Sequence, residues 1–388
     1  MLALLAAGCA ERPPAPERLT LHRAGFAELE GWTNDRQGEA LAAFLRSCAA
    51  REKAPDKALG RAEAPDGGPS MGFGTAADWQ AACAAAKAVP AGDDAAARGF
   101  FESAFTPYLA GSNGESEGLF TGYYEPELHG SRKPGARYHV PLYRVPDDLV
   151  TADLGLFREQ LKGIRITGRV KNGALRPYDT RADIDGGSLS GKGLEIVYVD
   201  DPVDAFFLHI QGSGRVTLDD GEVLRVGYAG ANGRSYVAIG GELAARGAIA
   251  KEDVTMQSIR AWLAAHPGEA EKVMQANPSY VFFRVLDGDG PIGAEGTVLS
   301  AGRSLAVDPK FIAYGTPLWL QARDPLDERV PLDRLLVAQD TGGAIKGPVR
   351  GDVFWGFGRD AAERAGKMKV TGRYYLLLPK PAAVASGR

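Results

Sequence analysis

This 388-residue sequence lacks an excess of basic charge, a long apolar run and a complete cofactor motif. Its net charge of −4 argues against a nucleic-acid-binding protein, which normally carries a basic face. No apolar run approaches the length of a membrane span. The five histidines are scattered without paired spacing, which argues against a zinc site, and no Gly-x-Ser-x-Gly nucleophile elbow is present. We therefore expect no metal and no cofactor.

Two loop sequences fall short of ligand motifs. The run GGSLSGKG, residues 186–193, matches a phosphate-binding loop except at its last position, where Gly193 replaces the metal-binding Ser or Thr. The run DGDGPIG, residues 287–293, lacks the ligand spacing of an EF-hand. Both are interpreted as loops or turns. The 50 glycines and 24 prolines favour a β-rich fold with many turns, and the length suggests two or three domains.

The N-terminus begins with a short apolar run followed by Ala-Ala-Gly and Cys9, a pattern that resembles a bacterial lipoprotein cleavage site. This predicts export, with Cys9 carrying a lipid, although the run is short and has no basic residues before it. An ordinary disordered terminus is the alternative. The other cysteines, Cys48 and Cys83, then form an even pair, which predicts one disulfide in an oxidising compartment, with two buried thiols as the alternative.

Helices are expected over residues 35–110 and strands from about residue 118. Thr75 to Asp78 has the pattern of a capping box at the start of one helix, and Asp93 or Asp94 is a candidate cap for the next. The run AFFLHIQGSGRVTLDDGEVLRVGYAG, residues 205–230, reads as three strands joined by turns, which places His209 in a strand with a structural role. Helices return within 235–275, and strands continue to about residue 379. Strands joined by hairpins favour two β-barrel-like units with a helical layer over a parallel βαβ sheet.

The stretch AQDTGGAIKGPVRGDVFWGFGR, which begins at residue 338, holds two carboxylates at the ends of a glycine-rich turn. Asp340 follows a plausible strand, and Asp352 precedes apolar residues able to raise the pKa of a carboxylic acid. Such an acid protonates the leaving oxygen in glycoside cleavage. Trp355 is a candidate platform for stacking on a sugar. The alternative is that each aspartate only hydrogen-bonds its turn.

Several long motifs, in order along the chain, resemble the lytic murein transglycosylase A family. They are GLFTGYYEP, DPVDAFFLHIQGSGRV, GYAGANGRSY, NPSYVFFR, GRSLAVDPKFIAYGTPLWL and QDTGGAIKGPVRGDVFWGFG, and they extend over about residues 118–378. The last block is similar to the family's three-aspartate domain, with Asp308, Asp340 and Asp352 at the positions of its aspartates.

The resemblance implies a mainly β fold with helices, in which a double-psi β-barrel domain and a smaller inserted β-barrel domain enclose a glycan groove. It implies a large domain from 21–127 with 239–380 and an insert over 128–238. Residues 1–20 are expected to be the remnant of an export signal and a linker, and 381–388 a disordered tail. We expect a periplasmic monomer that binds peptidoglycan glycan strands and is anchored to the outer membrane through Cys9.

The resemblance also implies the chemistry. The family cleaves the β-1,4 bond between N-acetylmuramic acid and N-acetylglucosamine without water, closing a 1,6-anhydro ring. Its single catalytic aspartate carries over to Asp352, with Asp340 as a supporting residue and Asp308 as a supporting or structural one. Residues in matching motifs are candidates for lining the groove: Thr121, Tyr123, Gln211, Ser213 and Lys346. Core packing is the alternative for one of Tyr123 and Tyr124, and an exposed turn position is the alternative for Lys346.

Two other functions compete with this one. A hydrolase acting on the same bond needs a second carboxylate to activate water or to attack the sugar. A non-catalytic glycan-binding or wall-loosening protein is the other alternative, because a fold alone does not imply catalysis.

Overall fold

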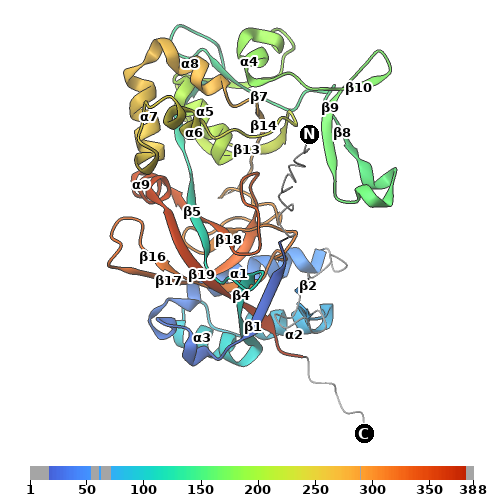
Figure 1. Cartoon of the computed structure of the whole chain (residues 1–388), viewed down its shortest axis with the longest axis vertical. Coiled ribbons are helices and arrows are strands. Elements are labelled where there is room, and N and C mark those ends of the chain that lie inside the picture. Colours follow the sequence, from blue (N-terminus) through green and yellow to red (C-terminus); the bar gives the residue numbers. More distant parts are fainter. Residues whose placement is uncertain (1–16, 54–60, 63–70, 289, 382–388) are drawn as a thin grey trace, which may run out of the picture.

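The computed structural model describes residues 17–53, 61–62, 71–288 and 290–381. The protein is mixed α and β, mainly β, and is built on two large sheets, one in the lower half of Figure 1 and one in the upper half. Strand β5 (Gly118–Glu125) runs from the lower sheet to the upper one. Strand β1 (Leu19–Arg23) begins inside the segment predicted to be a linker. Cys9 and residues 382–388 lie outside the described residues.

The first sheet has eight strands, and an additional pairing between β19 and β5 closes part of it into a ring. Strand β19 pairs with β5 through residues 369–372 and with β16 through residues 373–376. Strands β19-β16-β17-β15-β18-β5 thus form a closed cycle, with β4 and β1 continuing from β19. Besides β1 and β5, the strands are β4 (Phe105–Ser112), β15 (Ser304–Ala306), β16 (Pro317–Arg323), β17 (Pro331–Asp340), β18 (Arg350–Phe357) and β19 (Lys369–Pro379).

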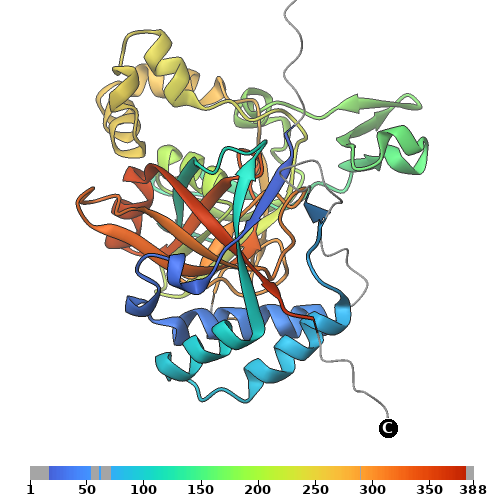
Figure 2. The ribbon, with the colours of Figure 1, turned by 60° about the horizontal axis from the view of Figure 1, so that its bottom comes forward.

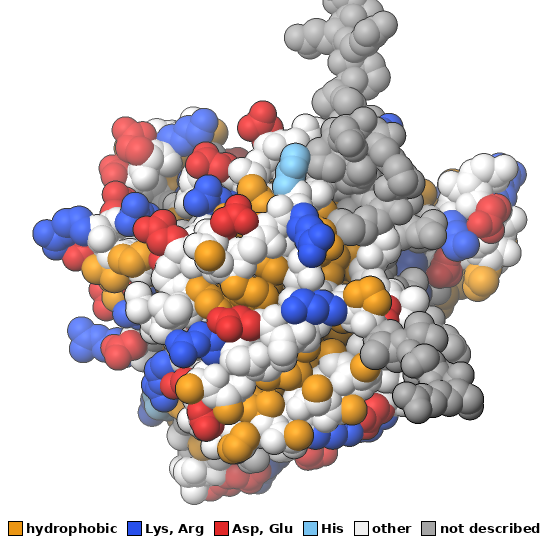
Figure 3. Space-filling view, turned by 90° about the horizontal axis from the view of Figure 1, so that it is seen from below, with side chains coloured by type: hydrophobic (Ala, Val, Ile, Leu, Met, Phe, Trp, Pro, Cys, Tyr) orange, Lys and Arg blue, Asp and Glu red, His pale blue; other side chains and the backbone are white. Residues whose placement is uncertain are grey.

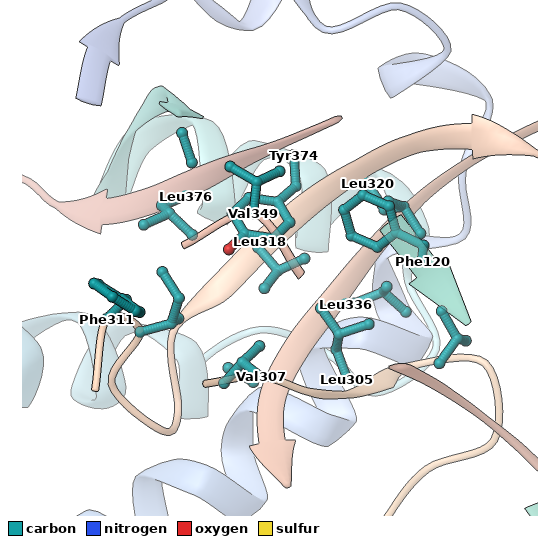
Figure 4. Close-up of a cluster of buried hydrophobic side chains, with 14 of the residues drawn as sticks. Phe120, Leu305, Val307, Phe311, Leu318, Leu320, Leu336, Val349, Tyr374 and Leu376 are labelled. Carbon is teal, nitrogen blue, oxygen red and sulfur yellow. The ribbon is translucent and has the colours of Figure 1, made fainter. Parts of the chain in front are cut away.

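The interior of this cycle is the main hydrophobic core (Figure 4). Five of its strands contribute fully buried side chains, among them Phe120, Leu305, Leu318, Leu336 and Leu376. Alternate side chains of a strand point to opposite faces, so each strand turns one apolar row inward. This packing fixes the strand register, and with it the positions of Asp340 on β17 and Asp352 on β18.

A helical layer covers one side of the first sheet (Figure 2). Its helices are α1 (Gln37–Lys53), α2 (Ala76–Lys87) and α3 (Asp94–Ala104), with a short ladder of β2 (Arg61–Ala62) and β3 (Met71–Gly72) nearby. The predicted starts of α2 and α3 are confirmed, since the Thr75 side chain accepts a hydrogen bond from Asp78 N and Asp93 caps α3. The predicted disulfide is also confirmed, because Cys48 on α1 is bonded to Cys83 on α2.

The second sheet has six strands in the order β14-β13-β12-β6-β11-β7. A bridge between Arg144 and Phe283 brings its outer strands together as well. Its last strand lies at 281–285, so this sheet extends beyond the boundary at residue 238 that the sequence suggested. The strands are β6 (Glu127–Ser131), β7 (Val140–Tyr143), β11 (Glu195–Val199), β12 (Ser213–Leu218), β13 (Val223–Ala231) and β14 (Val281–Val285).

The prediction that residues 205–210 form a strand is wrong, because they lie in helix α5 (Pro202–Gln211). Asp201 caps the helix start, Pro202 occupies its first turn, and Gly212 ends it with a φ of 79°. A short apolar run has no period that separates a buried strand from a buried helix. His209 is structural in its new setting: it is buried, and its Nδ1 accepts a hydrogen bond from Val281 N.

Helix α5 packs against a group of helices beside the second sheet. They are α6 (Ile239–Ala245), α7 (Met256–Ala265) and α8 (Pro267–Gln275), which confirms the helices predicted within 235–275. Helix α9 (Arg359–Lys367) lies between β18 and β19 in the chain, and a short turn, α4 (Arg181–Asp183), precedes β11. Within the described ranges, no helix combines the length and apolarity that crossing a membrane requires.

A buried ionic cluster joins the two sheets. Glu125, the last residue of β5, is fully buried. Its two carboxylate oxygens accept hydrogen bonds from Arg215 Nε at 2.9 Å and Arg225 Nη2 at 2.7 Å. These arginines lie on β12 and β13 of the second sheet, so the carboxylate at the end of β5 ties one sheet to the other.

A three-stranded arm projects from the upper half of the molecule (Figure 1). Its strands are β8 (Val150–Asp153), β9 (Arg165–Lys171) and β10 (Ala174–Pro177). Two 3-10 turns, η3 (Leu154–Leu156) and η4 (Glu159–Leu161), connect β8 to β9.

Candidate active site

The strand register places two of the three aspartates on either side of one residue. Ala306 of β15 pairs with Asp340 of β17 and with Asp352 of β18. Asp352 in turn pairs with Thr121 of the parallel strand β5. The backbones at Asp340 and Asp352 are therefore two strand spacings apart, about 10 Å. Glycine-rich residues 341–349 connect the two strands, which places both carboxylates beside the same turn.

The carboxyl group of Asp352 is held by a short chain of hydrogen bonds. The Thr121 hydroxyl donates to Asp352 Oδ1 at 2.6 Å, and Arg350 Nη2 donates to Thr121 Oγ1 at 2.9 Å. A guanidinium group has no acceptor, so the Thr121 hydroxyl must accept from Arg350 and point its own hydrogen at Asp352. In the described part of the chain, the other oxygen of Asp352 accepts no hydrogen bond. A proton on this carboxyl group therefore belongs on Oδ2.

Burial raises the pKa of Asp352 to about 6. The hydrogen bond from Thr121 and the positive charge of Arg350 act in the opposite direction, and the negative charge of Asp340 adds a further increase in the pKa. The group thus changes its protonation state near neutral pH, as a residue that both gives and takes a proton requires.

Asp340 is held differently, through both of its oxygens. The Tyr123 hydroxyl donates to Oδ2 at 2.8 Å, and Ala294 N donates to Oδ1 at 2.9 Å. Burial raises the pKa of Asp340, and these hydrogen bonds oppose that shift. Burial and the neighbouring Asp340 raise the pKa of Tyr123 well above its usual value, so its hydroxyl stays protonated and remains a donor. Asp340 therefore accepts a hydrogen bond on each oxygen, whereas Asp352 accepts one on Oδ1.

Asp308 binds backbone rather than another side chain. It is 6% exposed, and its two oxygens accept hydrogen bonds from Lys310 N at 3.1 Å and Gly347 N at 3.0 Å. Gly347 has a φ of 107°, which an L side chain rarely adopts. Asp308 therefore fixes the glycine-rich turn between the other two aspartates.

The remaining predicted site residues lie at different places. Lys346 is exposed at the glycine-rich turn. Gln211, at the end of α5, accepts a hydrogen bond through Oε1 from Tyr124 N, and Ser213 opens β12, half-buried. Tyr123 and Tyr124 point to opposite faces of β5, and it is Tyr123 that meets an aspartate.

The expectation that Trp355 stacks on a sugar needs correction. Residues 352 and 355 are three positions apart on β18, so their side chains point to opposite faces of the strand. The Trp355 ring is 9% exposed, packs in the main core and donates from Nε1 to Met368 Sδ at 3.4 Å. Phe354 is the aromatic residue on the Asp352 face, where it packs on Tyr123 at 5.2 Å between ring centroids.

Arg350 and Ala294 also contact the site, although neither was predicted from the sequence. Arg350 lies two residues before Asp352 on one strand, so the two-residue period places both side chains on the same face. This spacing could have indicated Arg350 from the sequence. Ala294 supplies only a backbone N–H, which no sequence pattern marks. Over the residues that the structure describes, no group of three His, Cys, Asp or Glu side chains is arranged to hold a metal ion.

A pocket of about 540 Å³ lies on the other face of β5, away from the carboxylates. Tyr124 lines it together with residues of α7 and α9, including Met256, Arg260 and Ala362. None of the three aspartates lines this pocket. The aspartates and this pocket therefore lie on different sides of β5.

Comparisons with known proteins identify the family of this chain. Residues 119–284 match the model of the MltA specific insert domain, and residues 303–378 match that of the 3D domain. The chain is 33% identical over 282 residues to membrane-bound lytic murein transglycosylase A of Escherichia coli strain K12, covering 71% of this chain and 69% of that protein.

Solved structures give the same result. A membrane-bound lytic murein transglycosylase from Agrobacterium tumefaciens superposes with a TM-score of 0.78 at 34% identity, covering 93% of this chain and 98% of that one. The E. coli protein crystallised with bound chitohexaose gives a TM-score of 0.65 at 26% identity, covering 96% and 94%. The chain therefore belongs to the lytic murein transglycosylase A family, with its insert domain and its 3D domain, and is a lytic murein transglycosylase.

Proposed function

We propose that the protein cleaves the β-1,4 bond between N-acetylmuramic acid and N-acetylglucosamine in peptidoglycan and leaves 1,6-anhydromuramic ends. Asp352 is the acid and then the base. The observation that carries this proposal is the setting of Asp352, a half-buried carboxyl group with a pKa of about 6 and one oxygen turned away from its hydrogen-bond donor.

The two steps use the same group. In the first, the Asp352 proton passes to the glycosidic oxygen as the bond from that oxygen to the muramic anomeric carbon breaks. In the second, the muramic 6-hydroxyl oxygen bonds to the anomeric carbon, and its proton returns to Asp352. The hydroxyl is part of the substrate, so no second carboxylate is needed to activate water. Thr121 stabilises the carboxylate that exists between the two steps.

Asp340 serves as a negative charge near the reacting sugar. Its oxygens accept hydrogen bonds from Tyr123 and Ala294, which holds the carboxylate in place and favours its ionised form. A fixed negative charge stabilises the positive charge that develops on the sugar ring. A hydrolase acting on this bond would use a second carboxylate as base or nucleophile. The two functions are distinguished by their products, as described below.

The closed cycle of six strands supports the proposal of a double-psi β-barrel for the first sheet and a smaller barrel for the second. The insert domain then spans about residues 127–285, with the rest of the described chain as the large domain. We place the glycan strand between the two, where Lys346, Gln211 and Ser213 contact it. The relative crystallised with chitohexaose supports a glycan ligand.

The site of action in this proposal is the periplasm, with Cys9 as a lipid anchor in the outer membrane. The disulfide between Cys48 and Cys83 supports an oxidising compartment, because such bonds are rare in a reducing cytosol. The curated relative is described as membrane-bound.

Product analysis tests the proposal. Purified peptidoglycan is digested with wild-type protein, with Asp352→Asn and with Asp185→Asn, and the masses of the soluble fragments are measured by mass spectrometry. Asp185 is the matched control, since burial also raises its pKa to about 6 but it lies outside the site. We expect anhydro ends from wild type and Asp185→Asn, and no soluble fragments from Asp352→Asn, which should still bind peptidoglycan.

Each competing function has its own result in this experiment. Reducing ends alone, one water heavier than anhydro ends, would identify a hydrolase. Binding of the wild-type protein without any released fragment would identify a non-catalytic glycan-binding protein. Normal turnover by Asp352→Asn would remove Asp352 from the mechanism.

A further inference from the structure

The arm formed by residues 150–177 has no role in the chemistry described above. It consists of β8, η3, η4, β9 and β10, and it extends away from the rest of the molecule (Figures 1 and 2). A small sheet ordinarily buries one apolar face against another element of the fold. The arm instead presents an apolar face that the described chain leaves exposed.

The register of the arm gathers its apolar side chains on one face. Ile166 of β9 pairs with Ala152 of β8, and Val170 of β9 pairs with Leu175 of β10. Directly paired residues point to the same side of a sheet, and residues two apart on one strand also share a side. Val150, two residues before Ala152, joins this set. The exposed fraction is 43% for Ile166 and 60% for Val170, so this face is open to solvent.

The opposite face is polar, and the body of the protein lies on that side. Thr167 and Arg169, which alternate with the apolar residues of β9, belong to it. The backbone at Gly233 approaches Thr167 so closely that an added Cβ would lie 2.7 Å from Thr167 Cβ. Arg169 Nη2 lies 2.6 Å from Asp179, and the guanidinium of Arg169 stacks over the ring of Tyr178. With its polar face held by these contacts, the arm turns its apolar face outward.

The end of the arm is its most exposed apolar part. Leu156 is 87% exposed, and the next residue, Phe157, is 75% exposed. Residues 150–177 include six basic and two acidic side chains, a net charge of +4 in a chain whose net charge is −4. Figure 3 shows the arm at the right edge of the molecule, with basic, acidic and a few hydrophobic side chains on the face seen from below. The basic residues are Arg158, Lys162, Arg165, Arg169, Lys171 and Arg176.

We propose that this arm docks the enzyme onto an anionic phospholipid surface. Elements that lie in a membrane interface combine an apolar face carrying Leu or Phe with a polar face rich in Lys and Arg. Each basic side chain near an anionic surface adds to the attraction, which falls with salt. The arm has both features, and the charge of the rest of the chain has the opposite sign.

A membrane fits the geometry of the arm better than a protein partner does. Leu156 and Phe157 lie in the connection between β8 and β9, outside the paired strands, and both are largely exposed. Stable protein interfaces bury about 800 Å² on each partner, with their most apolar residues at the centre of a packed surface. A projecting apolar tip instead enters a lipid layer without needing a complementary pocket. Docking through the arm would hold the domain with the aspartates at a fixed distance from the surface.

Vesicle sedimentation tests this docking on the full chain carrying Cys9→Ala, so that no acyl group contributes. Vesicles of phosphatidylglycerol mixed with phosphatidylcholine are compared with phosphatidylcholine alone, at low and high salt. We expect binding to the anionic vesicles that weakens at high salt. The double variant Leu156→Ser with Phe157→Ser should bind more than about tenfold more weakly, because two large apolar side chains leave the lipid.

Controls separate docking from misfolding and from other partners. Leu326→Ser changes a side chain that is 40% exposed elsewhere on the body, and it should leave vesicle binding unchanged. Peptidoglycan cleavage in solution should be the same for the tip variant and its parent. The proposal is wrong if the parent does not bind anionic vesicles or if the tip variant binds them equally well. A concentration-dependent dimer that the tip variant abolishes would overturn it by making a second copy the occupant.

Discussion

Replacing Thr121 by valine should move the pH dependence of the enzyme towards higher pH. The substitution keeps the size and branching of the side chain but removes the hydroxyl group that donates to Asp352 at 2.6 Å. This hydrogen bond favours the ionised form of Asp352 and so lowers its pKa against the effect of burial. Without it, Asp352 holds its proton more tightly.

The size of the shift follows from the strength of the bond. A hydrogen bond to a charged group contributes about 1.5–3 kcal/mol, and one pKa unit corresponds to about 1.4 kcal/mol. Losing the bond should therefore raise the pKa of Asp352 by about one to two units from its value of about 6. Arg350 remains in Thr121→Val and keeps its own lowering effect on this pKa.

The assay is the rate of muropeptide release across pH at low substrate concentration, so that the profile reports groups of the free enzyme. Asp352 must be protonated to act as an acid, so activity falls as pH rises through its pKa. In Thr121→Val this falling limb should lie about one to two units higher. Thr121→Ser keeps the hydroxyl group and should follow wild type. An unchanged limb in the valine variant, or an equal shift in the serine variant, would refute the reasoning.

Three further predictions concern stability. The pKa of Asp352 in the folded state, about 6, lies above its value in the unfolded chain, so ionisation of Asp352 destabilises the fold as pH rises from about 4 to above 6. Asp352→Asn does not ionise, so its unfolding free energy should rise by about 3 kcal/mol relative to that of wild type over this range. Urea unfolding at both pH values measures the difference. Equal stability differences at both pH values would contradict this. Reducing the bond between Cys48 and Cys83, 35 residues apart, should lower the unfolding free energy by up to about 4 kcal/mol, and a double serine variant that is insensitive to reductant is the control. Glu125→Ala removes the buried carboxylate that pairs with the half-buried Arg215 and Arg225 and should lower the unfolding free energy by up to about 3 kcal/mol. A variant with the same urea midpoint as wild type would argue against this cluster as the junction of the two sheets.

Much of the site was predictable because its residues lie close together in the sequence. Asp340 and Asp352 bound one glycine-rich turn, and the resemblance to a family placed Asp308 with them. The partners of these aspartates were less accessible. Thr121 and Asp352 are 231 residues apart in the chain and meet only because β5 and β18 pair in parallel. The spacing of residues along the chain carries no information about such a pairing. Only the resemblance to the family indicated Thr121, and it indicated a residue that lines the groove.

The errors have local physical causes. Trp355 was considered together with Asp352 because they are near in sequence, but the two-residue period of a strand separates them onto opposite faces. Residues 205–210 are apolar almost throughout, so burial on all sides hides the helical period, and the cap and Pro202 at the start were the better signals. In the second sheet β14 pairs with β13, although several helices lie between the two strands in the chain. Hairpin turns in the sequence do not indicate such a long-range pairing.

The direction of the hydrogen-bond chain is consistent with the proposed use of one carboxyl group in both steps. Because Arg350 donates to the Thr121 hydroxyl, that hydroxyl donates to Oδ1, and the proposed proton transfers would pass through Oδ2. In a β-linked muramic residue, the leaving oxygen and the 6-hydroxyl group lie on the same face of the ring. A single oxygen on that face therefore reaches the glycosidic oxygen first and the 6-hydroxyl next. In the proposed mechanism Asp340, which accepts a hydrogen bond on each oxygen, serves as the fixed charge, and Asp352 makes both proton transfers.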